Sequence, residues 1–233
     1  IISFVIGLIP FKYKPHFFRK NMRIRDSYKT QIRNFFMLTA FYELTQIIIN
    51  SSDILLVKHY FESYDAGLYA CLALIGRMIY FITWMFIMLL LPKVIELKKQ
   101  GEKTAFVLFK YIGYIAVISC VFVIACVLFP KTIVQLLFGN SYIAISSLLW
   151  KYTLATAMFA ISNIFAYYYL SIDKYIPVII SGVFGMLQMI LIVVFHESLE
   201  QVVYMQILAM LLLLIVQVLF FRVESRSIQN TIK

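Results

Sequence analysis

Long apolar segments separated by short polar ones dominate the pattern of hydrophobic and polar positions along this chain. Six of the segments reach about twenty residues or more, which is the length that an α-helix needs to cross a bilayer. We predict membrane-spanning helices over the ranges 34–57, 66–91, 105–129, 143–170, 176–195 and 202–221. Pro92 is expected to end the second helix, and a short amphipathic piece is expected at 132–138.

The ends of the chain complete the predicted organisation. The apolar run 1–9 is too short to span a bilayer, and we interpret it as the end of a truncated helix. Residues 10–33 are a basic linker, residues 34–221 are the six-span domain, and residues 222–233 are a polar tail. The predicted fold class is all-α: a polytopic transmembrane bundle of six full spans plus the end of another.

A polar stripe interrupts the first predicted span. Its members are Thr39, Glu43, Gln46, Asn50 and Asp53, at steps of four, three, four and three residues. At about 100° per residue these positions share one helical face, within an arc of roughly 80°. Such a stripe cannot face acyl chains without a large cost, so we expect it to face protein or a water-filled cavity.

Composition excludes a soluble domain, because 63% of the residues are hydrophobic and only 14% are charged. The net charge of +10 does not indicate a nucleic-acid partner, since the basic residues cluster in short loops. Segments 11–33, 92–104, 174 and 222–233 carry eight, four, one and three of them, whereas the loops on the other side carry Lys58 and Lys131. This asymmetry predicts that the linker and the C-terminus are cytoplasmic.

Arg77 is the sharpest functional candidate, because it lies about eleven residues, or roughly 16 Å, into its span. It shares a helical face with Tyr80 and Trp84. A guanidinium binds phosphate through two parallel hydrogen bonds, and aromatic rings stack on sugar faces. The alternative is a structural ion pair with Asp53 or Glu43, and the two interpretations are compatible.

Other polar residues in the spans keep two interpretations each. Glu43 either carries a coupling proton, since desolvation favours the protonated carboxyl, or makes a structural hydrogen bond to Gln46 or a neighbour. Asp53 is either functional or solvated at the outer interface. Lys151 either lines the cavity or reaches the headgroups, whereas Lys110 is expected to reach the cytoplasmic headgroups.

The sequence contains no nucleotide-binding loop, no glycine-rich phosphate cradle and no HExxH motif. The three cysteines lie in apolar runs without metal-ligand spacing. We therefore predict no cofactor and no catalytic residues, and we expect any energy source to be an ion gradient or another chain.

Three local motifs resemble those of a known family. The segment 65–69 (DAGLY) followed by a long apolar helix and Pro92, the loop 136–142 (LLFGNSY) and the turn 170–174 (LSIDK) occur in its order and spacing. They resemble the polysaccharide flippases, the Wzx-like branch of the multidrug/oligosaccharidyl-lipid/polysaccharide exporter superfamily. In the last motif Asp173 replaces the family's glycine, and the loop 196–200 lacks the usual proline and glycine.

The resemblance implies a two-lobe transporter of the bacterial plasma membrane, with this chain as its C-terminal half. The implied substrate is an undecaprenyl-pyrophosphate-linked oligosaccharide, flipped to the outer leaflet by cation-coupled alternating access for O-antigen or capsule synthesis. Arg77 and Lys151 would supply the cationic cavity, beside Asn50 and the two aromatic residues named above. Glu43 or Asp53 would couple a proton or sodium. Membrane lipids and a glycan polymerase are the other expected partners.

Several alternatives remain open. A lipid II flippase or a multidrug extruder of the same superfamily would share the helix pattern. A glycan polymerase or ligase is more distant, since it would need acid and base residues in a large outer loop, and the loop 130–142 has no carboxylate or histidine. A non-transporting membrane scaffold is the remaining class. We predict a transporter and not an enzyme.

Overall fold

A computed structural model describes residues 26–102 and 104–231 of the chain. The chain divides into two compact units, Ile1–Met37 and Leu38–Lys233, and the description below concerns the second. The predicted truncated helix at 1–9 and most of the predicted linker at 10–33 lie outside the described residues.

All regular elements of the described ranges are helices. In chain order they are α2 (Asp26–Tyr60), α3 (Ser63–Gln100), α4 (Ala105–Leu128), α5 (Pro130–Phe138), the 3-10 helix η2 (Asn140–Leu148), α6 (Leu149–Ser171), α7 (Ile176–Val194) and α8 (Leu199–Thr231). Five stretches of the described residues are long and apolar enough to cross a membrane: Ser63–Gln100, Ala105–Leu128, Asn140–Ser171, Ile176–Val194 and Leu199–Glu224. The all-α prediction is confirmed, and five of the six predicted spans are confirmed as apolar helices of spanning length. The remaining predicted span, 34–57, lies in α2. This helix is less hydrophobic because it carries the polar stripe.

Several predicted helix boundaries differ from those of the structure, and α2 begins at Asp26 and not at residue 34. Pro92 does not end α3, which continues to Gln100 and closes on Gly101 with φ +73°. A proline inside a helix removes one backbone hydrogen bond, and the helix can continue when packing holds its other bonds. The fourth span, predicted over 143–170, does not begin as an α-helix, since it starts within η2 and α6 begins only at Leu149. The predicted polar tail at 222–233 is helical as far as Thr231, where α8 ends.

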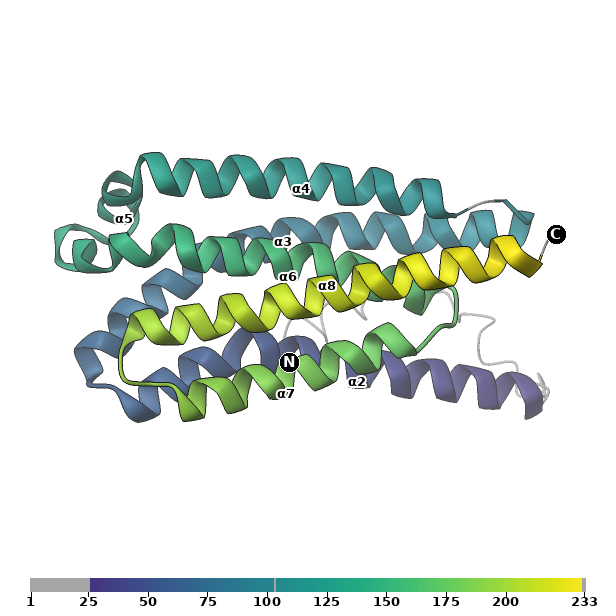
Figure 1. Ribbon diagram of the computed structural model, residues 1–233, viewed down its shortest axis with the longest axis horizontal. Helices are drawn as coiled ribbons and strands as arrows, with labels where there is room; N and C mark the ends of the chain where they lie inside the picture. Colours follow the sequence, from purple (N-terminus) through teal and green to yellow (C-terminus); the bar gives the residue numbers. More distant parts are fainter. Residues whose placement is uncertain (1–25, 103, 232–233) are drawn as a thin grey trace, which may run out of the picture. The chain divides into compact units, whose positions relative to one another are not determined.

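Helix α6 is the most enclosed spanning element, and α4 is the most exposed. In the most apolar windows of these two spans, 61% and 17% of the residues are buried. Figure 1 shows α6 running lengthwise among α3, α4 and α8. Small residues such as Ala155, Ala160 and Ala166 let neighbouring helices approach α6 closely, and all three are fully buried.

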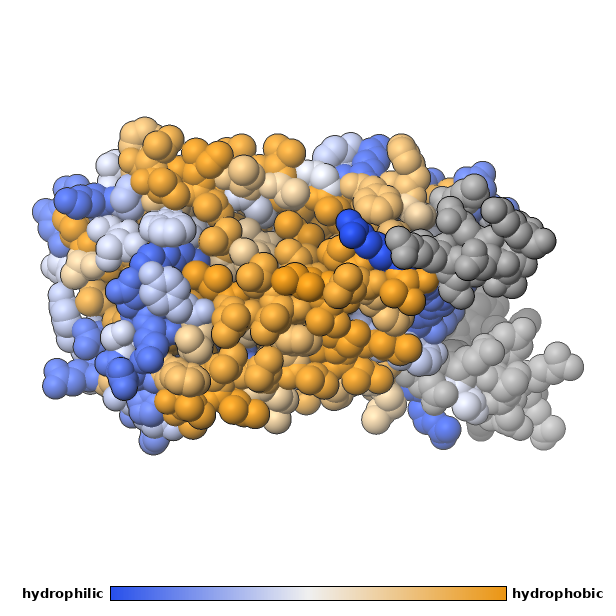
Figure 2. Space-filling view, in the orientation of Figure 1, coloured by the Kyte–Doolittle hydropathy of each residue, from blue (hydrophilic) through white to orange (hydrophobic). Residues whose placement is uncertain are grey.

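One face of the molecule is apolar across its middle (Figure 2). Figure 2 shows a broad hydrophobic band across the middle of one face, with hydrophilic residues gathered beside it. The exposed apolar residues include Val117 and Val121 of α4 and Val183 of α7. Exposed apolar side chains over most of a helix surface are typical of contact with lipid, so the chain is a membrane protein.

The turn after α6 connects three helices. Asp173 adopts the left-handed conformation with φ +64°, which favours glycine. The backbone N–H groups of Asp173 and Lys174 donate to carbonyl groups of the last turn of α6 and so complete a helix-ending motif. The Asp173 carboxylate lies 2.7 Å from Nζ of Lys98 in α3, and Lys174 pairs with Glu224 in α8.

Candidate functional site

Arg77 of α3 reaches across to the backbone of α2. Its Nη2 donates to the carbonyl oxygen of Asn50 at 2.7 Å. No carboxylate oxygen of the described residues lies within 4.0 Å of its guanidinium, and its buried Nε has no partner among them. The predicted ion pair with Asp53 or Glu43 is therefore not formed, because the guanidinium contacts the backbone of α2 and not an acidic side chain.

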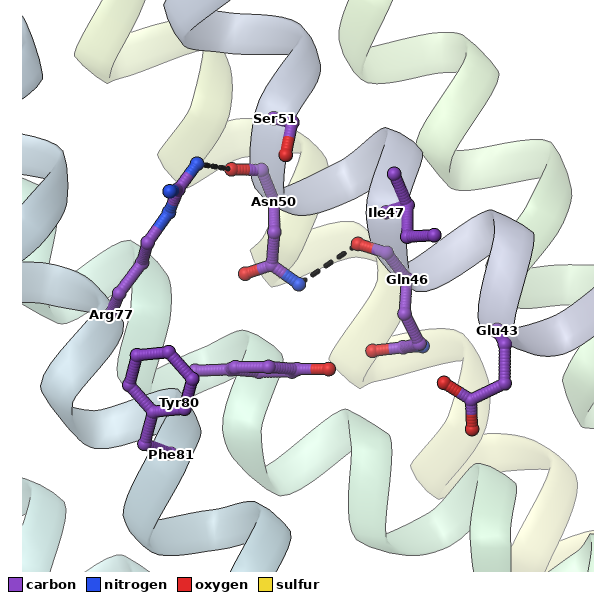
Figure 3. A pocket seen from close by; sticks show the side chains of 8 residues that line it. All are labelled: Glu43, Gln46, Ile47, Asn50, Ser51, Arg77, Tyr80 and Phe81. Carbon is purple, nitrogen blue, oxygen red and sulfur yellow. Dashed lines mark hydrogen bonds between the residues drawn. The ribbon is translucent and has the colours of Figure 1, made fainter. Parts of the chain in front are cut away.

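A pocket of about 200 Å³ opens beside this guanidinium. Helix α2 contributes Glu43, Gln46, Ile47, Asn50 and Ser51 to its lining, and α3 contributes Arg77, Tyr80 and Phe81. Figure 3 shows the guanidinium at one end of this set, the Glu43 carboxylate at the other, and the amides of Asn50 and Gln46 between them. The pocket combines a cation, hydrogen-bonding amides and aromatic rings, so it can bind an anionic group attached to a polar, ring-shaped body.

Two side chains of the pocket are fixed by residues of α6. Oε1 of Glu43 accepts a hydrogen bond from the Tyr167 hydroxyl at 2.6 Å. Of the structural partners predicted for Glu43, Gln46 or a neighbour, the structure shows a neighbour, because the Gln46 side chain has no hydrogen-bond partner among the described residues. The Tyr80 ring stacks on Phe159, with centroids 6.1 Å apart and planes 10° apart. The structure therefore holds both groups before any ligand is present.

Asp53 is fully buried at the junction of four helices. Its Oδ2 accepts hydrogen bonds from Tyr152 of α6 at 2.8 Å, Tyr69 of α3 at 3.0 Å and Gln206 of α8 at 3.3 Å. Its Oδ1 has no partner within the described part of the chain. The interpretation of Asp53 as a solvated carboxylate at the interface is wrong, because the other three helices cover it.

The polar stripe of α2 therefore serves two environments. Gln46 and Asn50 line the open pocket, with Glu43 at its edge. Asp53 belongs to a buried cluster that it forms with Tyr69, Tyr152 and Gln206. For these four members of the stripe, this confirms the expectation that the stripe faces protein or a cavity. Asn50, Arg77 and Tyr80 are brought together as the sequence predicted.

Two predicted site residues lie elsewhere. Trp84 is 41% exposed and does not line the pocket. Lys151 Nζ lies 2.5 Å from Oε1 of Glu200 and 2.8 Å from the Tyr204 hydroxyl. It does not join the Arg77 pocket, because the part of α6 that carries it faces the start of α8.

Sequence reasoning missed the residues that complete both sites from other helices. Tyr152 and Tyr167 come from α6 and gave no signal of their own, since tyrosines are common throughout the chain. Gly76 is a third residue that sequence reasoning missed. It lets the Tyr152 ring pack closely on α3, since a Cβ at this position would lie 2.4 Å from that ring. A buried glycine next to an intramembrane arginine is the one signal that could have indicated a close helix contact there.

The fold and the pocket define a helical membrane protein with a buried carboxylate and a cationic pocket. Residues 1–147 match the family described as "Polysaccharide biosynthesis protein". The match covers more than half of the chain, which therefore belongs to this family, and it includes α2 and α3 with Asp53 and Arg77. Neither the comparison with curated proteins nor the comparison with solved structures found a match.

Proposed function

We propose that the chain is part of a Wzx-like flippase of the bacterial plasma membrane. It moves an undecaprenyl-pyrophosphate-linked oligosaccharide from the cytoplasmic to the outer leaflet, for O-antigen or capsule synthesis. The observation that carries the proposal is Arg77, a cation without a carboxylate within 4.0 Å among the described residues, on the wall of an open pocket. Membership of the polysaccharide biosynthesis family supports a glycan substrate.

The pocket suits two adjoining parts of such a substrate, the pyrophosphate and the first sugar. The guanidinium would bind the pyrophosphate, since its hydrogen bond to Asn50 uses one of its five N–H donors and leaves the others for the anion. The Tyr80 ring and the amides of Asn50 and Gln46 would contact the first sugar. Each of these groups would be taken out of lipid by a second helical lobe, since a polar pocket cannot open onto acyl chains.

Coupling would use the carboxylates of the same helix. Glu43 lies at the edge of the pocket, and Asp53 lies in the buried cluster. Each of these carboxylates could take up and release the coupling cation. In this proposal the chain forms the C-terminal lobe with a cytoplasmic C-terminus, alternates access with the other lobe, and delivers its cargo to the polymerase machinery. It performs no covalent chemistry itself.

The test is depletion of the full-length protein in its own cells, followed by mass spectrometry of undecaprenyl-linked oligosaccharides. An outside-only glycan-modifying enzyme reports the leaflet. We expect complete repeat units to accumulate protected on the inner face. Complementation with Arg77→Ala should fail, and Lys110→Ala, which removes another cation within a span, should restore export.

The other outcomes point to different proteins. Repeat units that accumulate unpolymerised but accessible from outside would contradict flipping and indicate a polymerase. Accumulation of lipid II would indicate the peptidoglycan branch of the superfamily. Unchanged lipid-linked glycans would indicate a drug extruder or a scaffold, and in a scaffold the joint neutral replacement of Arg77 and Glu43 should be tolerated.

A further inference from the structure

Arg77 also lies on the wall of a second, smaller space of about 10 Å³, roughly the room that one water molecule needs. Asn50, Tyr152 and Gln206 line this space as well. Tyr152 and Gln206 are two of the three residues that donate hydrogen bonds to Asp53. The guanidinium therefore stands between the open pocket on one side and the immediate surroundings of Asp53 on the other.

Tyr152 joins these two places directly. Gly76 immediately precedes Arg77, and a Cβ on it would lie 2.4 Å from Cε1 of the Tyr152 ring. The ring therefore packs on the backbone of α3 beside Arg77, while its hydroxyl donates to Asp53 at 2.8 Å. Any change at the carboxylate that moves this hydroxyl also changes the packing beside Arg77.

The cluster has a hydrogen-bond arrangement for either charge state of Asp53. The Tyr69 hydroxyl lies 3.0 Å from Oδ2 of Asp53 and 3.4 Å from Oε1 of Gln206. With the carboxylate ionised, Tyr69 donates to Asp53. With the carboxyl protonated, the same hydroxyl can accept the proton of Asp53 and donate to Gln206, since a hydroxyl both donates and accepts.

We propose that the charge state of Asp53 sets the anion affinity of the Arg77 pocket, with Tyr152 as a positioning residue between them. The identity of the anion, a pyrophosphate, rests on the function proposed above. An ionised Asp53 offsets part of the positive potential of Arg77 in a medium of low dielectric constant, and a protonated Asp53 does not. Linkage is reciprocal, so binding of the anion favours uptake of one proton from the aqueous phase.

The charged and titratable groups around Asp53 are few within the described residues. Helix α3 presents Tyr69 and Arg77, and α6 presents Tyr152. Helix α8 presents Gln206, which does not titrate. On α2 itself, Glu43 lines the open pocket and is the other group whose protonation would change the potential at Arg77, so the experiment must separate it from Asp53.

The experiment measures binding of geranyl pyrophosphate to the full-length protein in nanodiscs by calorimetry. Two buffers of different ionisation enthalpy report the protons taken up per anion. We expect wild-type affinity to rise as the pH falls from about 8.5 to about 5.5, with proton uptake beyond that of the probe. Asp53→Asn should tighten binding at the high pH by about fivefold or more and abolish the extra uptake.

Three variants act as controls or second readouts. Glu43→Gln should keep the extra proton uptake, and Asp65→Asn, the same chemical change at the start of α3, should leave affinity and uptake unchanged. Tyr152→Phe keeps the ring on Gly76 but removes a donor that favours the ionised carboxylate. It should therefore move the midpoint of the pH profile to higher pH, which loss of packing alone would not do.

The failure of this inference differs from the failure of the proposed function. If the wild type binds the probe through Arg77 but takes up no more protons than Asp53→Asn, the linkage is refuted. If Asp53→Asn does not fold, an unchanged pH profile in Tyr152→Phe, together with no extra uptake by the wild type, refutes it equally. Absence of binding, or equal binding by Arg77→Ala, would instead contradict the proposed pyrophosphate pocket.

Discussion

Replacement of Gly76 by alanine tests the contact that joins the two sites. The new Cβ would lie 2.4 and 2.5 Å from two carbons of the Tyr152 ring and 2.9 Å from the Thr156 hydroxyl oxygen. To restore an ordinary carbon–carbon contact, the ring must move by about 1 Å. Such a shift weakens the 2.8 Å hydrogen bond from Tyr152 to the buried Asp53.

The expected loss of stability follows from three contributions. Overpacking costs about 1–3 kcal/mol. Removal of a hydrogen bond to a buried carboxylate costs about 1–3 kcal/mol. Alanine recovers about 1 kcal/mol over glycine through its higher helix propensity. We therefore expect Gly76→Ala to lower the free energy of unfolding by about 3 kcal/mol.

The assay is reversible unfolding in mixed micelles, followed by circular dichroism. Gly113→Ala in α4 is the matched control, because nothing lies within 4 Å of a Cβ there, and it should be neutral or stabilising by up to about 1 kcal/mol. In a Tyr152→Ala background, where the ring is absent, Gly76→Ala should cost much less. Equal stability of Gly76→Ala and Gly113→Ala would refute the argument.

Two further predictions concern residues with a positive φ, Asp173 and Gly139. Asp173→Gly and Asp173→Ala both lose the exposed pair with Lys98, but only glycine adopts the left-handed conformation without strain. In thermal unfolding, Asp173→Gly should therefore be more stable than Asp173→Ala by about 1–2 kcal/mol. Equal stability of the two variants would contradict the strain. Gly139→Ala, at φ +89° with open space around the new Cβ, should cost about 1–3 kcal/mol through backbone strain alone, and a cost no larger than that of Gly113→Ala would contradict it.

Asp173 shows where a local motif and the structure agree. The resemblance expects glycine at this position, and the backbone there adopts the left-handed conformation that favours glycine. An aspartate can occupy it at modest cost, since its short polar side chain tolerates this conformation. Here the carboxylate also reaches Lys98 of α3. A departure from the motif thus leaves the helix ending intact.

The sequence by itself determined the helical class, five of the spans and the polar face of α2, because these depend on apolar length and on a period of 3.6 residues within one segment. It also placed Asn50, Arg77 and Tyr80 in one pocket, since each lies on the polar face of its own helix. It misplaced Trp84, which lies farther along α3, and Lys151, which lies in the first turn of α6 and contacts the start of α8.

Only the tertiary structure decided what surrounds Asp53. Its partners Tyr69, Tyr152 and Gln206 are 16, 99 and 153 residues away in the chain. Periodicity gives the face on which a side chain lies, but not the rotation of that helix against its neighbours or their relative height. Close packing fixes both, here through the contact between Gly76 and the Tyr152 ring, and no local pattern encodes that contact.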